Sequence, residues 1–181
     1  MEKVKEVPYG VADFVTVMEQ NLYYVDKTMF IPELEKQPRN LFFIRPRRFG
    51  KSTFLSMLHS YYDCNQSAKF QSLFGNLWIG QHPTELQGKY QVLFLDFSQV
   101  SGNIDSLERN FDFYCSVKLD GFMRRYGEAY SEETREKVRK AEYAMDKLAF
   151  IHDEAAQKGF YAIRKILFDS DGNRRTYELV G

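Results

Sequence analysis

Four consecutive residues of this chain have the types and the spacing to hold a phosphate chain. They end the stretch RPRRFGKST, residues 45–53. Gly50 permits close approach of the backbone, and Lys51 supplies the cation that reaches the β and γ phosphates in a P-loop. Ser52 offers a hydroxyl ligand for Mg²⁺, and Thr53 can hydrogen-bond an α-phosphate. This chemistry also needs a helix N-terminus after the loop, because its N–H groups and dipole favour anions.

The start of this loop departs from the usual P-loop pattern, which opens with a glycine. Arg45 stands at that position, and Pro46 holds φ at about −65° there. With Arg47 and Arg48, the loop carries four cations within seven residues. These cations would repel one another without an anion, which favours a bound polyphosphate. The alternative is a basic surface turn that Ser52 caps.

The segments on either side of the loop suit a phosphate site. Residues 41–44 form a continuous apolar run, which is typical of a buried strand. After the loop, apolar residues recur at helical spacing and predict a helix over residues 51–62. A strand, a loop and a helix in this order are the context that such a motif requires.

Apolar runs and periodic patterns predict the remaining elements. The expected strands are 22–25, 41–44, 91–98 and 176–180, the expected helices are 27–36, 51–62, 104–126 and 138–155, and residues 160–168 suit either. Strands alternating with helices predict an α/β fold, a three-layer P-loop NTPase-like sandwich. Only two strands are well marked, so we expect this sandwich to be incomplete, with few strands and many helices.

Composition narrows the class of protein. Lys plus Arg and Asp plus Glu both number 25, so net charge gives no argument for nucleic-acid or membrane binding. The N-terminus is charged and does not resemble a signal peptide, and no apolar run approaches the roughly 18 residues of a membrane span. Cys64 and Cys115 lie far apart without a C-x-x-C pair, which argues against a zinc site or a disulfide scaffold. A cytoplasmic protein without a membrane partner is expected.

Several motifs together resemble the bacterial AAA-ATPase-like family. They are GVADF (10–14), YYVDKT (23–28), RPRRFGKST (45–53), MLHSYYD (57–63) and VLFLDFS (92–98). The resemblance implies an ATPase α/β sandwich that binds ATP with Mg²⁺, and it makes Arg45 a family trait. It assigns residues 1–130 to the N-terminal part of the ATPase-like domain and leaves 131–181 as a helical region with a divergent tail. That tail could be lineage-specific, a remnant of a deleted longer protein or the product of a truncated gene. The predicted nucleotide-binding residues are Arg47, Arg48, Phe49, Gly50, Lys51, Ser52 and Thr53.

Hydrolysis of ATP needs an acidic residue at a strand end to hold Mg²⁺. Asp96 ends the apolar run VLFL and is the candidate metal ligand, although such a residue more often caps the next turn. The family's Walker B strand usually ends in an Ile-Asp-Glu-Tyr-Asp-like run, and residues 100–181 contain none. We therefore predict ATP binding and doubt hydrolysis by this chain alone.

Two alternative functions remain open at this point. Members of the family often carry a C-terminal nuclease of the PD-D/E-x-K type, whose residues this chain does not show. The chain could be a nucleic-acid-associated module of such a nuclease or defence system, with the loop arginines and Arg39 on phosphates. It could also be a non-hydrolysing interaction module.

Four further residues have a functional and a structural interpretation. Asp26 or Lys27, in the motif YYVDKT, could lie near the nucleotide or in an ion pair with Arg47 or Arg48. The alternative is a surface lysine at position 27 and an N-cap at Asp26, and we favour the cap. Tyr9 and Phe14 could stack on an adenine, but core packing is the commoner use of such aromatic side chains.

Overall fold

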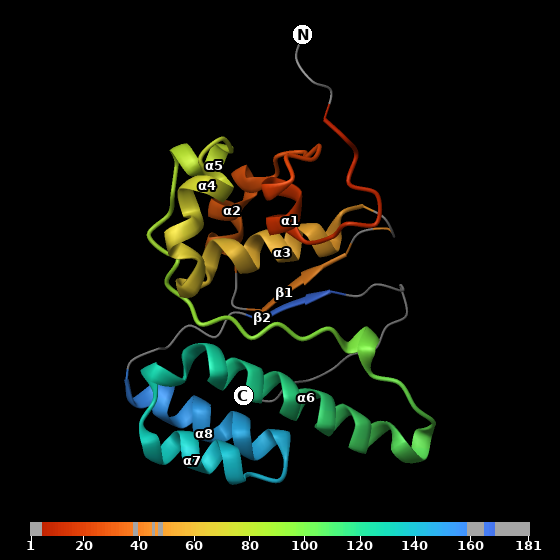
Figure 1. The fold of residues 1–181 in the computed structure, drawn as a ribbon, viewed down its shortest axis with the longest axis vertical. Helices are drawn as coiled ribbons and strands as arrows, with labels where there is room; N and C mark the ends of the chain where they lie inside the picture. Colours follow the sequence, from red (N-terminus) through yellow and green to blue (C-terminus); the bar gives the residue numbers. More distant parts are fainter. Residues whose placement is uncertain (1–4, 38–39, 45, 47–48, 159–164, 169–181) are drawn as a thin grey trace. The chain divides into compact units, whose positions relative to one another are not determined.

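The computed structural model describes residues 5–37, 40–44, 46, 49–158 and 165–168. The chain divides into two compact units (Figure 1). Unit 1 is Met1–Tyr90 together with Ile163–Gly181, and unit 2 is Gln91–Ala162. In the described ranges, no helix combines the length and the apolar character needed to cross a membrane.

Unit 1 consists of short helices around one longer helix, α3, and a two-stranded sheet. Its helices are α1 (Phe14–Glu19), η1 (Thr28–Phe30), α2 (Ile31–Lys36), α3 (Lys51–Tyr62), η2 (Cys64–Lys69), α4 (Phe70–Phe74) and α5 (Trp78–Gln81). Strands β1 (Asn40–Phe43) and β2 (Lys165–Phe168) are parallel, with Asn40 opposite Lys165. In Figure 1, α3 lies between the sheet and the short helices α1, α4 and α5. The helix that follows the candidate loop therefore belongs to unit 1 and packs against α1 and η2.

The core of unit 1 forms on one face of α3. Phe54, Met57, Leu58 and Tyr61 recur at spacings of three and four residues, so one stripe of the helix is buried. The remaining members of this core are Phe14, Ile31, Leu73, Phe74 and Ile79. Helices α1, α2, α4 and α5 are each too short to be stable alone, so this shared aromatic core is what holds them.

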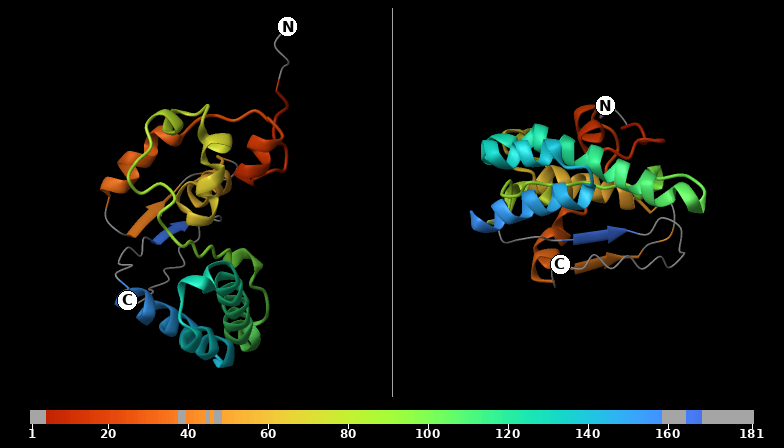
Figure 2. Two further views of the ribbon diagram at one scale, coloured as in Figure 1. Left: turned by 60° about the vertical axis from the view of Figure 1, so that its left-hand side comes forward. Right: turned by 90° about the horizontal axis from the view of Figure 1, so that it is seen from below.

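Unit 2 is built from three helices, α6 (Ile104–Tyr126), α7 (Glu132–Lys140) and α8 (Ala144–Gln157), with short 3₁₀ turns η3 (Phe97–Gln99) and η4 (Gly127–Ala129) (Figure 2). Side chains cap the first two helices. Asn103 Oδ1 accepts the N–H of Ser106 at 3.1 Å, and Ser131 Oγ accepts the N–H of Thr134 at 3.2 Å. These caps satisfy N–H groups that the helices leave unpaired and so mark where each helix begins.

The expected three-layer α/β sandwich is wrong. In the described part of the chain there are two strands of four residues each, joined in one sheet, and most other residues are helical. Residues 91–96, expected as a buried strand, are irregular, and so are residues 22–25. The N–H of Val92 donates to the Tyr126 hydroxyl at 3.2 Å, and that of Asp96 to the Tyr114 hydroxyl at 2.6 Å. Side-chain hydroxyls thus satisfy backbone donors that a neighbouring strand would satisfy in a sheet.

Several other expectations agree with the structure. The strand before the loop lies at Asn40–Phe43, one residue earlier than expected, and the helices at 51–62 and 104–126 are confirmed. The expected helix 27–36 begins as a 3₁₀ turn, and 138–155 is divided between α7 and α8. Of residues 160–168, the described part is strand β2, and 176–180 lies outside the described residues. The division at residue 130 stays a prediction.

Candidate functional site

Gly50 ends the candidate loop in a left-handed conformation, with φ 73°, and α3 begins at the next residue. Glycine adopts this conformation without the steric cost that a Cβ brings. The first helical hydrogen bond runs from the N–H of Phe54 to the carbonyl of Gly50 at 2.9 Å. The N–H groups of Ser52 and Thr53 precede this bond and have no hydrogen-bond partner among the described residues. They are available to an acceptor at the positive end of the helix dipole.

Lys51 bends back over the loop instead of extending into solvent. Its Nζ donates to the carbonyl of Pro46 at 3.0 Å, five residues earlier in the chain. The Ser52 hydroxyl is exposed, and the neighbouring Phe49 side chain is 59% exposed. The structure therefore brings Gly50, Lys51, Ser52 and Thr53 together at one helix terminus. Arg45, Arg47 and Arg48 lie outside the described residues.

A second segment reaches the same terminus. A methyl group placed on Gly50 would lie 3.6 Å from Nζ of Lys27, and apart from sequence neighbours no other described residue comes within 4 Å. Lys27 is half-buried. The sequence left open whether this lysine lies near the candidate loop, and the structure places it there. Lys27 and Gly50 are far apart in the chain, so local sequence pattern could not predict that they lie close together. The motif YYVDKT was the one sequence feature that drew attention to Lys27.

Helix α1 is anchored to α3 by polar contacts from the motif GVADF. Ser56, on α3, donates to Asp13 Oδ1 at 3.1 Å and accepts the N–H of Phe14 at 2.9 Å. Phe14 itself is fully buried, with its ring stacked on Phe74 at 4.9 Å. Phe14 is thus a core residue that cannot stack on an adenine, whereas Tyr9 is 97% exposed.

Asp96, the candidate metal ligand, belongs to unit 2 and acts as a cap. Its Oδ1 accepts the N–H of Ser98 at 3.1 Å and the Ser98 hydroxyl at 2.7 Å, and its Oδ2 accepts Nε2 of Gln99 at 3.3 Å. The hydrogen bonds from Ser98 lower the pKa of the Asp96 carboxyl, against the opposing effect of burial. This geometry favours the capping interpretation, and the metal role stays a prediction. Across the described residues, no group of three or more His, Cys, Asp or Glu side chains could hold a metal ion.

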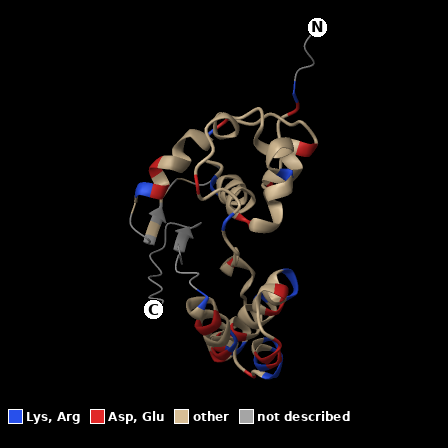
Figure 3. Ribbon diagram, turned by 90° about the vertical axis from the view of Figure 1, so that its left-hand side faces the viewer, with Lys and Arg blue, Asp and Glu red and all other residues tan. Residues whose placement is uncertain are grey.

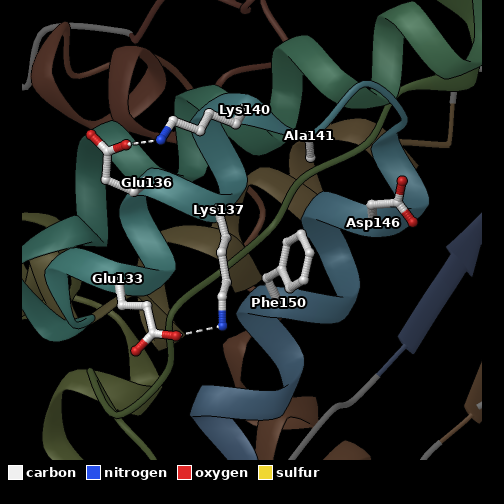
Figure 4. Close-up of a pocket in the computed structure, with 7 residues that line it drawn as sticks. All are labelled: Glu133, Glu136, Lys137, Lys140, Ala141, Asp146 and Phe150. Atoms are coloured by element: carbon white, nitrogen blue, oxygen red, sulfur yellow. Dashed lines mark ion pairs between the residues drawn. The ribbon is translucent and has the colours of Figure 1, made fainter.

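Unit 2 also contains a hollow of about 400 Å³ beside α7 and α8, which Figure 4 shows in close-up. Its lining residues are Glu133, Glu136, Lys137, Lys140, Ala141, Asp146 and Phe150. The charges largely neutralise one another, with Glu133–Lys137 at 2.7 Å and Glu136–Lys140 at 2.9 Å. Figure 3 shows the same mixture of acidic and basic residues along the helices of unit 2. This hollow has none of the excess positive charge that a phosphate ligand needs.

Comparison with known proteins identifies one family and one relative. A family model described as "Predicted AAA-ATPase" matches residues 8–164, which is most of the chain. A protein from Azotobacter chroococcum mcd 1, described as an uncharacterized protein in the vnfD 5' region, is 43% identical over 63 residues. That match covers 34% of this chain and only 12% of the relative's length. No solved structure matches the chain.

Proposed function

Because the chain belongs to the AAA-ATPase-like family, whose model matches residues 8–164, we propose that it binds ATP with Mg²⁺ through residues 45–53. The family's description supports nucleotide binding in general terms. The geometry of the α3 N-terminus supports this particular loop. A left-handed glycine opens a helix of twelve residues, and the ammonium of the next residue, Lys51, bends back over the loop. This arrangement is the observation that carries the proposal.

The chemistry of the groups around Gly50 fits a phosphate chain. The N–H groups of Ser52 and Thr53 and the Lys51 ammonium are all donors, and they lie at the positive end of a helix. Gly50 has no side chain to block close approach of a ligand to the backbone. An anionic ligand with several acceptor oxygens would satisfy all of these groups at once.

The exposed Ser52 hydroxyl is the group proposed to ligate Mg²⁺. When bound, the ion would neutralise charge on the outer phosphates. Arg47, Arg48 and Phe49 complete the proposed nucleotide-binding set by their place in the loop sequence. Asp96 is not needed for binding in this proposal.

Calorimetric titration with ATP–Mg²⁺ tests the proposal on the native chain and on Lys51→Ala. Loss of one charge-assisted contact should weaken binding by about 10- to 100-fold. Lys36→Ala is a matched control, because it removes an exposed lysine that pairs with Glu33 on α2, and it should bind within about twofold of native. Absence of binding by the native chain would overturn the proposal.

A turnover assay on the same samples addresses hydrolysis. We expect bound ATP with little or no phosphate release, because residues 100–181 contain no run like the Ile-Asp-Glu-Tyr-Asp of a Walker B strand. Salt-dependent binding of DNA or RNA by a chain that does not bind ATP would instead favour the nucleic-acid-associated alternative.

A further inference from the structure

We propose that Lys27 is a second phosphate-binding lysine, which contacts the same phosphate chain as Lys51. This inference rests on the proposed nucleotide site. It goes beyond that site because residue 27 belongs to a separate segment of the chain, ahead of β1.

The Lys27 ammonium lies close to Gly50. Its Nζ lies 3.6 Å from where a Cβ of Gly50 would be. Gly50 immediately precedes α3, so this ammonium lies at the helix end where the dipole is positive. A lysine that served only to interact with the helix would be more stable near the C-terminus, where the dipole attracts cations.

The backbone on both sides of Lys27 is held firmly. Asp26 Oδ1 accepts the N–H of Thr28 at 2.8 Å and its hydroxyl at 2.7 Å, while Asp26 Oδ2 accepts the N–H of Trp78 at 2.7 Å. Thr28 is fully buried, and its hydroxyl oxygen accepts the N–H of Ile79 at 3.1 Å. These bonds tie residues 26–28 to the start of α5. Lys27 is thus presented from a rigid support, as a binding residue should be.

The charge of Lys27 also favours an anionic ligand. Within the described residues, the Lys27 side chain has no hydrogen bond and no ion pair with a carboxylate, although its backbone carbonyl accepts the N–H of Phe30 at 3.2 Å. The neighbouring Asp26 carboxylate already accepts three hydrogen bonds from neutral donors. A half-buried cation beside a helix N-terminus and a second lysine is unfavourable by itself. A polyphosphate would bridge Lys27 and Lys51 and convert this repulsion into attraction.

The experiment compares the native chain with Lys27→Met, which keeps the aliphatic stem and removes the charge. Each protein is titrated with ATP–Mg²⁺ and with inorganic tripolyphosphate, which separates contacts to the phosphates from contacts to the base. We expect Lys27→Met to bind both ligands about tenfold more weakly than native, as for loss of one charge-assisted hydrogen bond. Lys27→Arg should stay within about threefold, because it retains the charge. Lys36→Met is the matched control and should change neither affinity.

Unfolding in urea without ligand provides a readout that separates binding from structure. If Lys27 binds phosphate, Lys27→Met should be at least as stable as native, because removal of the charge relieves repulsion at the α3 N-terminus. A clear loss of stability would instead make Lys27 a structural residue and overturn the inference. Equal affinities of Lys27→Met and native for both ligands would overturn it too, while leaving the nucleotide site intact. A native chain that binds neither ligand would overturn both proposals.

Discussion

Units 1 and 2 are stabilised in different ways. Unit 1 has an aromatic core and polar contacts between segments distant in sequence, such as Tyr62 OH to Glu35 Oε1 at 3.0 Å and Thr84 Oγ1 to the same oxygen at 2.7 Å. Unit 2 also joins distant residues, as in the Lys147–Asp120 ion pair at 2.6 Å, and it adds several short-range ion pairs. Helix α7 carries ion pairs at spacings of three and four residues, including Arg135–Glu132 at 2.6 Å.

The two units differ in the charges that their contacts bring together. In unit 2 the Glu and Lys side chains of α7 neutralise one another, as in the pairs Glu133–Lys137 and Glu136–Lys140. The contacts of unit 1 hold Lys27 and Gly50 side by side although they come from separate segments. A binding site needs residues from separate segments to come together. Among the described residues, unit 1 brings Lys27 to the end of the cationic loop in this way.

The largest expected effect is loss of the unit 1 core in Phe74→Ala. The Phe74 ring stacks on Phe14 at 4.9 Å and on Phe70 at 5.5 Å, and it meets Tyr61 edge-on. Removing it should lower the free energy of unfolding by about 3–5 kcal/mol. Unfolding in guanidinium followed by tryptophan fluorescence measures this loss, because the only tryptophan of the chain, Trp78, lies in unit 1.

Phe113→Ala is the control for that variant. Phe113 lies on α6 in unit 2 and is 70% exposed, so its loss should change stability by less than about 0.5 kcal/mol. In Phe74→Ala, circular dichroism should show that the helices of unit 2 unfold at the same guanidinium concentration as they do in the native chain. If the fluorescence and circular dichroism transitions of Phe74→Ala both move to lower guanidinium concentration together, the two units unfold as one. That result would refute the prediction that they are stabilised separately.

Acid should weaken unit 2 through Glu154. Burial acts to raise the pKa of this carboxyl, but hydrogen bonds from Lys158, Thr134 and Ser131 outweigh it and lower the pKa to about 2 from an ordinary 4.5. Its ionised form is thus favoured in the folded state. The stabilisation is fully present above about pH 4.5 and is lost as pH falls toward 2.

Glu154→Gln should therefore cost on the order of 2 kcal/mol at pH 7 and much less at pH 3. Urea unfolding followed by circular dichroism at the two pH values measures the difference. Glu133→Gln, which removes an exposed pair with Lys137, should cost under about 0.5 kcal/mol. A Glu154→Gln penalty that does not change with pH would contradict the assigned pKa.

The smallest expected effect is that of Asp96→Ala. Loss of this cap should destabilise unit 2 by about 1 kcal/mol and leave affinity for ATP–Mg²⁺ within about twofold of native. Titrations with and without Mg²⁺ measure the affinity. A Mg²⁺-dependent loss of ATP affinity would show instead that Asp96 is a metal ligand, and would assign a residue of unit 2 to the site.

Some parts of the structure could be predicted from local sequence because local physics decides them. The apolar spacing of α3 and α6 predicted both helices at their observed bounds, since one buried stripe is enough to specify such a helix. The order of strand, loop and helix around Gly50 was predictable for the same reason. The family was recognisable from short motifs, of which RPRRFGKST is the most specific.

The sequence by itself thus determined the main helices, the cationic loop and the family. Only the tertiary structure decided that residues 91–96 are irregular, that Asp96 caps a turn and that Lys27 meets Gly50. Each of these depends on which distant group supplies a partner. An apolar run becomes a strand only beside another strand, and here the hydroxyls of Tyr114 and Tyr126 accept hydrogen bonds from its backbone instead. Local pattern contains no information about such partners.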